Sequence, residues 1–287
     1  MSTSGARVRC GFREFLLGTR THVLGVVNVT PDSFSDGGHT LDVDRAIQHG
    51  TRMMAEGADI VDVGGESTRP GAVPVGEETE IARVVPVIEG LVRAGVTAIS
   101  VDTRNAATAR AAVRAGARWL NDVSALQHDP QMIEVAPEFD AVILMHARGD
   151  PATMQEVPIV YEDVVGEVRR FLEQRVAYAV AHGVAAEKLL VDPGIGFGKL
   201  LEHNLALSRS LDLLRGDAAG VVYGPSRKRF LGELTGIRVP AERDRATLGA
   251  VSFAASRGAD IVRVHDVKGT VEALQVVDAL ARAQGST

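Results

Sequence analysis

The sequence predicts a single-domain α/β protein with the (β/α)8 barrel fold, and three observations support this prediction. The chain has 287 residues, a length that one barrel of this kind can occupy. Short apolar runs alternate with longer amphipathic segments about eight times, and glycines follow many of those segments, as they do at helix ends. No linker, internal repeat or low-complexity tract divides the chain. A doubly wound parallel sheet is the alternative fold.

The first strand is predicted at residues 23–29, where β-branched apolar residues suit a strand buried on both faces. Thr30 and Pro31 end this strand, and a loop of Asp, Ser, Phe and Gly follows. A second loop, residues 64–71, is too rich in Gly and Pro to be helical. The other predicted elements of the first half are helix 42–56, strand 60–63, helix 77–94, strand 98–101, helix 105–115, strand 119–123 and strand 141–145.

The second half of the chain repeats the alternation. Its predicted elements are helix 161–182, strand 189–191, strand 220–223, strand 261–264 and a closing helix near 269–283. Residues 1–22 precede the first unit, and we expect them to form a small hairpin or cap across the floor of the barrel. The barrel itself is predicted to occupy residues 23–287.

The composition excludes several classes of protein. The net charge of -6 offers no overall basic field for nucleic acid or anionic lipid, so any anion site must be local. The single cysteine, Cys10, excludes an internal disulfide and a cysteine-based metal cluster. The N-terminus has no apolar signal region, and the later apolar runs are too short to span a bilayer. These features predict a cytoplasmic protein that binds neither nucleic acid nor membrane.

Polar side chains fall at the predicted strand ends, where barrels of this kind hold their active sites. Any one of them could be structural, because a buried Asp at a strand end often caps a neighbouring loop. Several together would cost several kcal/mol unless they met hydrogen-bond donors, and a pterin ring supplies N–H donors of this kind. The residues concerned are Asn28, Asp62, Asp102, Asn121, His146, Asp192, Lys228, Arg263 and His265.

A second group is cationic and follows the last two predicted strands. Ser226, Arg227 and Lys228 come after one strand, and Arg263 and His265 lie on the next. Barrels commonly bind phosphate at these loops, although an Arg-Lys pair alone is often only a solvated face. Because both groups end strands and the first follows Gly224, we favour an anion site here.

The glycine-rich residues 192–200 do not form a nucleotide-binding loop. Gly194 to Lys199 is one residue short of the P-loop spacing, and Leu200 stands where Ser or Thr would hold magnesium. Glycines let the backbone lie beside a planar ring on which Phe197 can stack. No zinc-binding helix motif or acyl-enzyme elbow is present in the sequence.

Seven motifs together resemble the dihydropteroate synthase family. They are Asn28-Val-Thr-Pro-Asp-Ser-Phe-Ser-Asp-Gly-Gly38, Asp62-Val-Gly-Gly-Glu-Ser-Thr-Arg-Pro-Gly71, Ser100-Val-Asp-Thr103, Asn121-Asp122, Asp192-Pro-Gly-Ile-Gly-Phe-Gly-Lys199, Gly224-Pro-Ser-Arg-Lys228 and Arg263-Val-His-Asp-Val267. The resemblance covers residues 20–280 and implies a barrel enzyme, a transferase of folate biosynthesis and sulfonamide target. Such an enzyme joins 4-aminobenzoate to 6-hydroxymethyl-7,8-dihydropterin diphosphate, with Mg2+ as cofactor, and releases diphosphate.

The resemblance also implies roles for residues of this chain. Asn28 would contact Mg2+, whereas the pterin would be held by Asp102, Asn121, Asp192 and Lys228. The diphosphate would face Thr68, Arg263 and His265, and the aminobenzoate site would be shaped by Phe34, Arg69, Pro70 and Ser226. Phe197 and Val264 are further predicted substrate-binding residues. Leu200 and Ala147 depart from the family pattern at positions without an assigned role.

We expect a dissociative displacement, with Asp36, Arg69 and Lys228 as the catalytic residues. Asp36 would stabilise the pterin cation, and Arg69 would help to spread the charge of the leaving diphosphate. A homodimer is possible. The alternatives are a pterin-dependent methyltransferase, which would not need residues 67–70, a phosphate-binding aldolase, which would need a lysine in mid-strand, and a catalytically silent pterin-binding paralogue.

Overall fold

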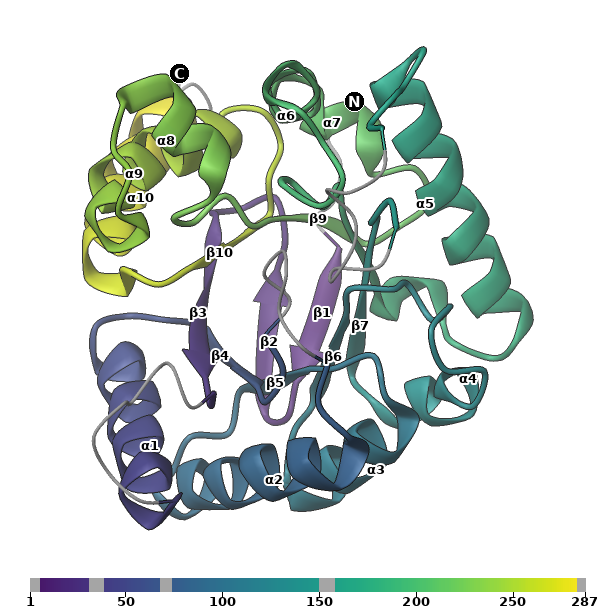
Figure 1. The fold of residues 1–287 in the computed structure, drawn as a ribbon, viewed down its shortest axis with the longest axis vertical. Coiled ribbons are helices and arrows are strands. Elements are labelled where there is room, and N and C mark those ends of the chain that lie inside the picture. Colours follow the sequence, from purple (N-terminus) through teal and green to yellow (C-terminus); the bar gives the residue numbers. More distant parts are fainter. Residues whose placement is uncertain (1–5, 31–38, 68–73, 150–157, 283–287) are drawn as a thin grey trace.

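A computed structural model describes residues 6–30, 39–67, 74–149 and 158–282 of the chain, without the side chains of residues 39–41 and 282. Within these ranges the chain alternates strand and helix in the predicted manner, and the helices surround the strands as a ring (Figure 1). None of these helices combines the length and the apolar character needed to cross a bilayer.

Eight parallel strands close into a barrel in the order β10-β3-β4-β5-β6-β7-β8-β9. The closed barrel confirms the predicted fold and excludes the doubly wound sheet, which would leave two free edges. The strands of the barrel are β3 (His22–Asn28), β4 (Ile60–Gly64), β5 (Ile99–Asp102), β6 (Trp119–Asp122), β7 (Ala141–Met145), β8 (Leu189–Asp192), β9 (Gly220–Tyr223) and β10 (Ile261–Val264).

The helices lie on the outer face of the barrel, where they cover its apolar side chains. The α-helices are α1 (His39–Ala55), α2 (Glu77–Arg93), α3 (Ala106–Ala115), α4 (Met132–Val135), α5 (Val164–Ala181), α6 (Leu201–Arg209), α7 (Leu211–Leu214), α8 (Arg229–Thr235), α9 (Asp244–Ala255) and α10 (Val267–Arg282). Short 3-10 helices are η2 (Ala136–Glu138), η3 (Ala186–Lys188) and η4 (Pro240–Arg243).

Helix α5 shows how a local cap moves a boundary away from the sequence prediction. Apolar spacing predicts a helix from residue 161, but the helix begins at Val164. Asp163 is its N-cap, and its carboxylate accepts a hydrogen bond of 3.0 Å from the backbone N–H of Gly166. A side chain that satisfies a free N–H of the first turn fixes where the helix starts.

The barrel has an apolar inner layer at its floor, the end at which its strands begin. Side chains alternate along a strand, so every second residue points inward. Ile60 packs in this layer, whereas its neighbour Val61 packs among the helices. Other inward residues of the same layer are Leu24, Trp119, Leu190 and Ile261.

An antiparallel hairpin, β1 (Arg7–Cys10) with β2 (Arg13–Leu16), closes this floor. The indole N–H of Trp119 donates a hydrogen bond of 2.6 Å to the backbone oxygen of Arg9, and Phe15 meets the indole edge-on at 5.9 Å. Cys10 is buried in the same layer, and burial raises the pKa of its thiol. A buried, protonated thiol is inert, which agrees with an apolar packing role.

Candidate active site

A polar layer lies directly above the apolar floor inside the barrel. Its residues follow floor residues by two positions, so the alternation of a strand turns them to the same inner face. Asp62 follows Ile60, Asn121 follows Trp119, Asp192 follows Leu190 and Arg263 follows Ile261. The alternation therefore brings four polar groups from four strands to the mouth of the barrel.

Arg263 joins two carboxylates of this layer. Its Nε donates to Asp62 Oδ2 at 2.7 Å, and its Nη2 donates to Asp102 Oδ2 at 2.6 Å. Asn121 Nδ2 also donates to Asp62 Oδ2, at 3.0 Å. Within the described residues the remaining terminal nitrogen of Arg263, Nη1, makes no hydrogen bond, so it is available to a ligand.

The shared guanidinium decides the charges of this group. Burial raises the pKa of the Asp102 carboxyl to about 7, against the attraction of Arg263, which Asp102 must share with the nearby carboxylate of Asp62. Burial also disfavours the charge on Arg263, but the two carboxylates outweigh it and raise the pKa of the guanidinium. Arg263 thus stays charged while Asp102 can gain or lose a proton near neutral pH.

Asp192, Lys228 and Arg263 converge around Gly224. A Cβ atom added at Gly224 would lie 3.7 Å from Asp192 Oδ2, 3.9 Å from Lys228 Nζ and 3.7 Å from Arg263 Cβ. Burial raises the pKa of Asp192 and lowers that of Lys228 to about 8, and each shift is opposed by the charge of the other residue. The site therefore presents an acceptor and a donor side by side.

The predicted platform for a planar ring lies beside this pair. Lys228 Nζ donates to the backbone oxygen of Ile195 at 2.5 Å and sits 4.6 Å from the centre of the Phe197 ring. Asp192 Oδ1 accepts a hydrogen bond of 2.7 Å from the N–H of Gly194, and Gly196 N–H donates to Asn204 Oδ1 at 2.7 Å. The glycine loop is thus fixed against the acid and the lysine.

Replacing Gly194 by Ala should lower the free energy of unfolding by about 2 to 3 kcal/mol, because φ is +66° and the new Cβ would lie 1.8 Å from the backbone oxygen of His146. Gly183→Ala is the matched control: φ is +94° there, but no atom lies within 4 Å of the new Cβ. Urea unfolding of both variants measures the difference. Equal losses would mean that the close approach at Gly194 costs nothing.

Four other predicted site residues lie in the described part of the chain, namely Ser226, His265, Asn28 and Val264. Ser226 Oγ lies 2.9 Å from His265 Nδ1 and accepts from the His265 backbone N–H at 3.2 Å, so these two residues form one unit. Asn28 ends β3 at the mouth, where it is half-buried. The Val264 side chain instead packs among the helices, so only its backbone can reach a ligand in the barrel.

Five predicted residues lie outside the described residues: Phe34, Asp36, Thr68, Arg69 and Pro70. The stem of the second loop is described and is anchored. Glu66 pairs with Arg104 at 3.1 Å, with both side chains 9% exposed, and Arg83 donates to the backbone oxygen of Gly65 at 2.8 Å. These contacts hold Gly65 and Glu66 in place.

The structure assigns contacts to two residues, Asp62 and Glu80, for which no specific role was predicted. Asp62, one of the predicted polar strand-end residues, accepts hydrogen bonds from both Arg263 and Asn121. Glu80 of α2 is buried and accepts hydrogen bonds from Thr103, Asn105 and Thr108, which fixes the turn after Asp102. The alternation in β4 could have assigned Asp62 to the interior, whereas nothing in the sequence near Glu80 pointed to its partners. Arg227 forms a two-pronged ion pair with Asp244, at 2.7 and 2.8 Å.

The described residues could supply one ligand to a magnesium ion but do not form a site that surrounds the ion with protein ligands. Among the described residues no three His, Cys, Asp or Glu side chains cluster at metal-binding spacing. The Asn28 side chain makes no hydrogen bond there, and its amide oxygen is a suitable hard ligand. Mg2+ often takes one or two protein ligands and completes its shell with water and phosphate oxygens, so Asn28 fits an ion that arrives with diphosphate.

Comparison with known proteins decides the family. The family model described as pterin binding enzyme matches residues 24–265. The chain belongs to the pterin-binding enzyme family. It is 45% identical over 264 residues to the dihydropteroate synthase of Escherichia coli K12, covering 92% of this chain and 93% of that protein. It is 48% identical over 267 residues to the dihydropteroate synthase of Mycobacterium leprae, covering 91% and 94%.

Solved structures of dihydropteroate synthases are also similar to this chain. The dihydropteroate synthase of Xanthomonas albilineans with 4-aminobenzoic acid matches with a TM-score of 0.90 and 45% identity, over 99% of this chain and all of that one. A complex of dihydropteroate synthase from the same organism with 7,8-dihydropteroate matches with a TM-score of 0.86 and 42% identity, covering 98% and 100%. A Yersinia pestis dihydropteroate synthase in a sulfonamide complex matches with a TM-score of 0.89 and 42% identity, covering 96% and 99%.

Proposed function

We propose that this chain is a dihydropteroate synthase, a transferase that joins 4-aminobenzoate to 6-hydroxymethyl-7,8-dihydropterin diphosphate and releases diphosphate and 7,8-dihydropteroate. One observation carries the proposal. A buried acid, an amide and a lysine, Asp192, Asn121 and Lys228, line the mouth of a barrel that is similar throughout its length to enzymes of this name.

The polar layer suits the pterin edge. The ring offers N–H donors, which the carboxylates of Asp192 and Asp102 can accept, and ring acceptors, which Asn121 and Lys228 can donate to. Phe197 and the glycine loop supply an apolar surface for the flat face of the ring. Pairing every buried polar group with the ligand removes the cost of burying them.

The diphosphate would lie on the cationic side of the mouth. Arg263 can use Nη1, and the Ser226–His265 unit lies on the adjoining loops. Asn28 would hold Mg2+, which would neutralise charge on the phosphate oxygens when bound. Arg69 and Thr68 would complete this side from the second loop. Preorganised charges of this kind lower the cost of the departing anion by several kcal/mol.

The reaction would then follow a dissociative course. The bond from the exocyclic methylene of the pterin to the diphosphate breaks with both electrons leaving on oxygen, and the dihydropterin ring delocalises the positive charge. Asp36 would stabilise that charge. The amine of 4-aminobenzoate is neutral and nucleophilic, so it attacks the methylene and then loses a proton, and no strong base is needed before the attack.

The test is the release of diphosphate by the purified chain in the presence of Mg2+ and pterin diphosphate. Release that requires 4-aminobenzoate and yields 7,8-dihydropteroate supports the assignment. Tight pterin binding with no product would instead indicate a silent pterin-binding protein.

The affinity for a pterin without phosphates should depend on pH. Asp102 accepts N–H donors only when ionised, so affinity should fall about tenfold per unit as pH drops below about 7. Lys228 donates best as the ammonium, so affinity should also fall as pH rises above about 8. Calorimetry with 6-hydroxymethylpterin from pH 5 to 10 measures both limbs. Asp102→Asn should change the acidic limb, to which Asp192 also contributes because burial raises its pKa too. A limb identical to that of the wild type would contradict the assignment of Asp102.

We also propose a homodimer. Exposed apolar side chains lie on α7, α8 and α9, with Leu213 53%, Leu234 53% and Phe253 41% exposed. Light scattering of the purified chain gives its mass directly.

A further inference from the structure

Lys199, at the end of the glycine loop, is a buried lysine that makes no ion pair in the described part of the chain. Lys199 Nζ lies 2.9 Å from His146 Nδ1, 3.3 Å from the backbone oxygen of His146 and 3.0 Å from the backbone oxygen of Phe197. Burial lowers the pKa of Lys199 well below its usual value. A charged Lys199 donates to all three partners, and a neutral one donates to the two carbonyl oxygens and accepts from His146 Nδ1–H, so either form keeps the three contacts.

These bonds join two loops. His146 follows β7, whereas Phe197 belongs to the glycine loop after β8. The two loops also approach each other closely, because a Cβ added at Gly194 would lie 1.8 Å from the His146 backbone oxygen. The contact to His146 Nδ1 holds in either protonation state of Lys199, because a charged Lys199 donates to a bare Nδ1 and a neutral Lys199 accepts from Nδ1–H.

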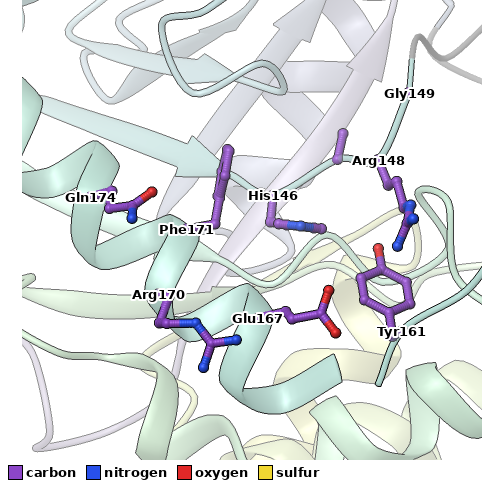
Figure 2. Close-up of a pocket in the computed structure, with 9 residues that line it drawn as sticks. His146, Arg148, Gly149, Tyr161, Glu167, Arg170, Phe171 and Gln174 are labelled. Carbon is purple, nitrogen blue, oxygen red and sulfur yellow. The ribbon is translucent and has the colours of Figure 1, made fainter. Parts of the chain in front are cut away.

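Packing alone does not hold the imidazole on its other side. Figure 2 shows His146 between Phe171 of α5 and the pair formed by Tyr161 and Arg148. Phe171 meets the ring edge-on at 4.8 Å, but a cavity of about 460 Å³ opens next to these side chains. His146 is only 7% exposed and its ring lies 6.3 Å from that of Tyr161, so packing and the contact with Lys199 together set its orientation.

Lys199 also contacts Phe197, the residue of the predicted platform for a planar ring. One of its bonds fixes the carbonyl of Phe197, and the ring of that residue faces Lys228 at 4.6 Å. We propose that Lys199 is a positioning residue that ties the loops after β7 and β8 together and so holds Phe197 in place for the pterin ring. The proposal rests on the proposed function, because it takes the pterin as the ligand of the platform.

The chain offers a matched control in Lys188. This lysine also donates to backbone oxygens, those of Phe139 at 2.8 Å and Pro137 at 3.3 Å. It directly precedes β8 and so lies at the floor end of the same strand, away from the platform. Substituting Lys188 therefore removes comparable bonds without touching the glycine loop.

The experiment compares Lys199→Met with Lys188→Met. Calorimetry with 6-hydroxymethylpterin should show a dissociation constant raised about 10- to 100-fold in Lys199→Met and unchanged in Lys188→Met, the size expected for lost bonds to a charged donor. Hydrogen exchange of the amides of residues 194–199 should be faster only in Lys199→Met. Unchanged affinity and exchange in Lys199→Met would overturn the proposal.

Nitrogen NMR of chains with labelled histidine compares the wild type with Lys199→Met. The His146 Nδ1 resonance should move in the variant, because its bonded partner is removed, and an unchanged resonance would overturn the proposal. If the wild type failed to bind 6-hydroxymethylpterin, the proposed function would fall. The Nδ1 resonance and the exchange rates would still decide whether Lys199 ties the loops together.

Discussion

Replacing Arg263 by Ala should lower kcat/KM at least about a thousandfold and the free energy of unfolding by about 3 to 5 kcal/mol. Arg263 is the cation that Asp62 and Asp102 share, at 2.7 and 2.6 Å, and both carboxylates are buried. Without it two acids lie unpaired in the barrel. The diphosphate would also lose the Nη1 donor.

Arg215→Ala is the control for this loss. Arg215 pairs with the buried Asp260 at 2.8 Å at the floor of the barrel, far from the mouth. Its removal should cost stability but leave kcat/KM near the wild-type value. A second variant separates the two effects of Arg263. Arg263→Ala combined with Asp62→Asn removes one unpaired charge, so it should recover stability but not activity.

The pH dependence of the Arg263→Ala variant follows from the same charges. Unpaired buried carboxyls take up protons more readily in the folded chain than in the unfolded one, so their pKa values rise. Stability from such groups is present at low pH and is lost as pH rises through the folded pKa. The deficit of Arg263→Ala should therefore shrink between pH 7 and pH 5. A deficit that stays constant over this range would show that the carboxylates are not its cause.

Replacing Asp192 by Asn should weaken the binding of 6-hydroxymethylpterin by about 2 to 4 kcal/mol. Asp192 Oδ1 already accepts from Gly194 N–H at 2.7 Å, which leaves Oδ2 for the ligand, near the Lys228 ammonium. An amide can keep the first bond, but its NH2 group then faces the N–H donors of the pterin and the charge of Lys228. The N–H groups of the amide and of the pterin would then face each other without an acceptor between them.

Asp260→Asn is the matched control for Asp192→Asn. Asp260 Oδ2 accepts from Val221 N–H at 2.8 Å, so it too is a buried acid bonded to backbone next to a strand. Its variant should lose stability with pterin affinity unchanged. If Asp192→Asn bound the pterin as tightly as the wild type in calorimetry, the pterin would not lie on Asp192.

The strands were predictable because a parallel strand that is buried on both faces consists of a local run of apolar residues. Residues 141–145 are such a run, and they form β7 as expected. The polar layer was partly predictable for the same reason, since Asn121 and Asp192 end such runs. The first residues of the helices were harder to predict than the strands. The start of α5 depends on the cap at Asp163 rather than on apolar spacing.

The partners of the site residues could not be predicted. Arg263 lies 201 positions after Asp62 and 161 after Asp102, and they meet only because β10 pairs with β3 to close the barrel. The bond from Lys199 to His146 likewise depends on the register of β7 and β8. A single sequence specifies which residues point inward, but not which of them touch across the closed sheet.

Trp119 is the only tryptophan of the chain, and it lies in the floor layer with its indole N–H bonded to the hairpin. Its fluorescence is therefore a reporter of the floor rather than of the mouth. The emission should shift to longer wavelength when the hairpin leaves and water reaches the indole, and it should be indifferent to whatever occupies the opposite end. The chain thus carries its own optical probe of unfolding, one that can be read for every variant of the mouth.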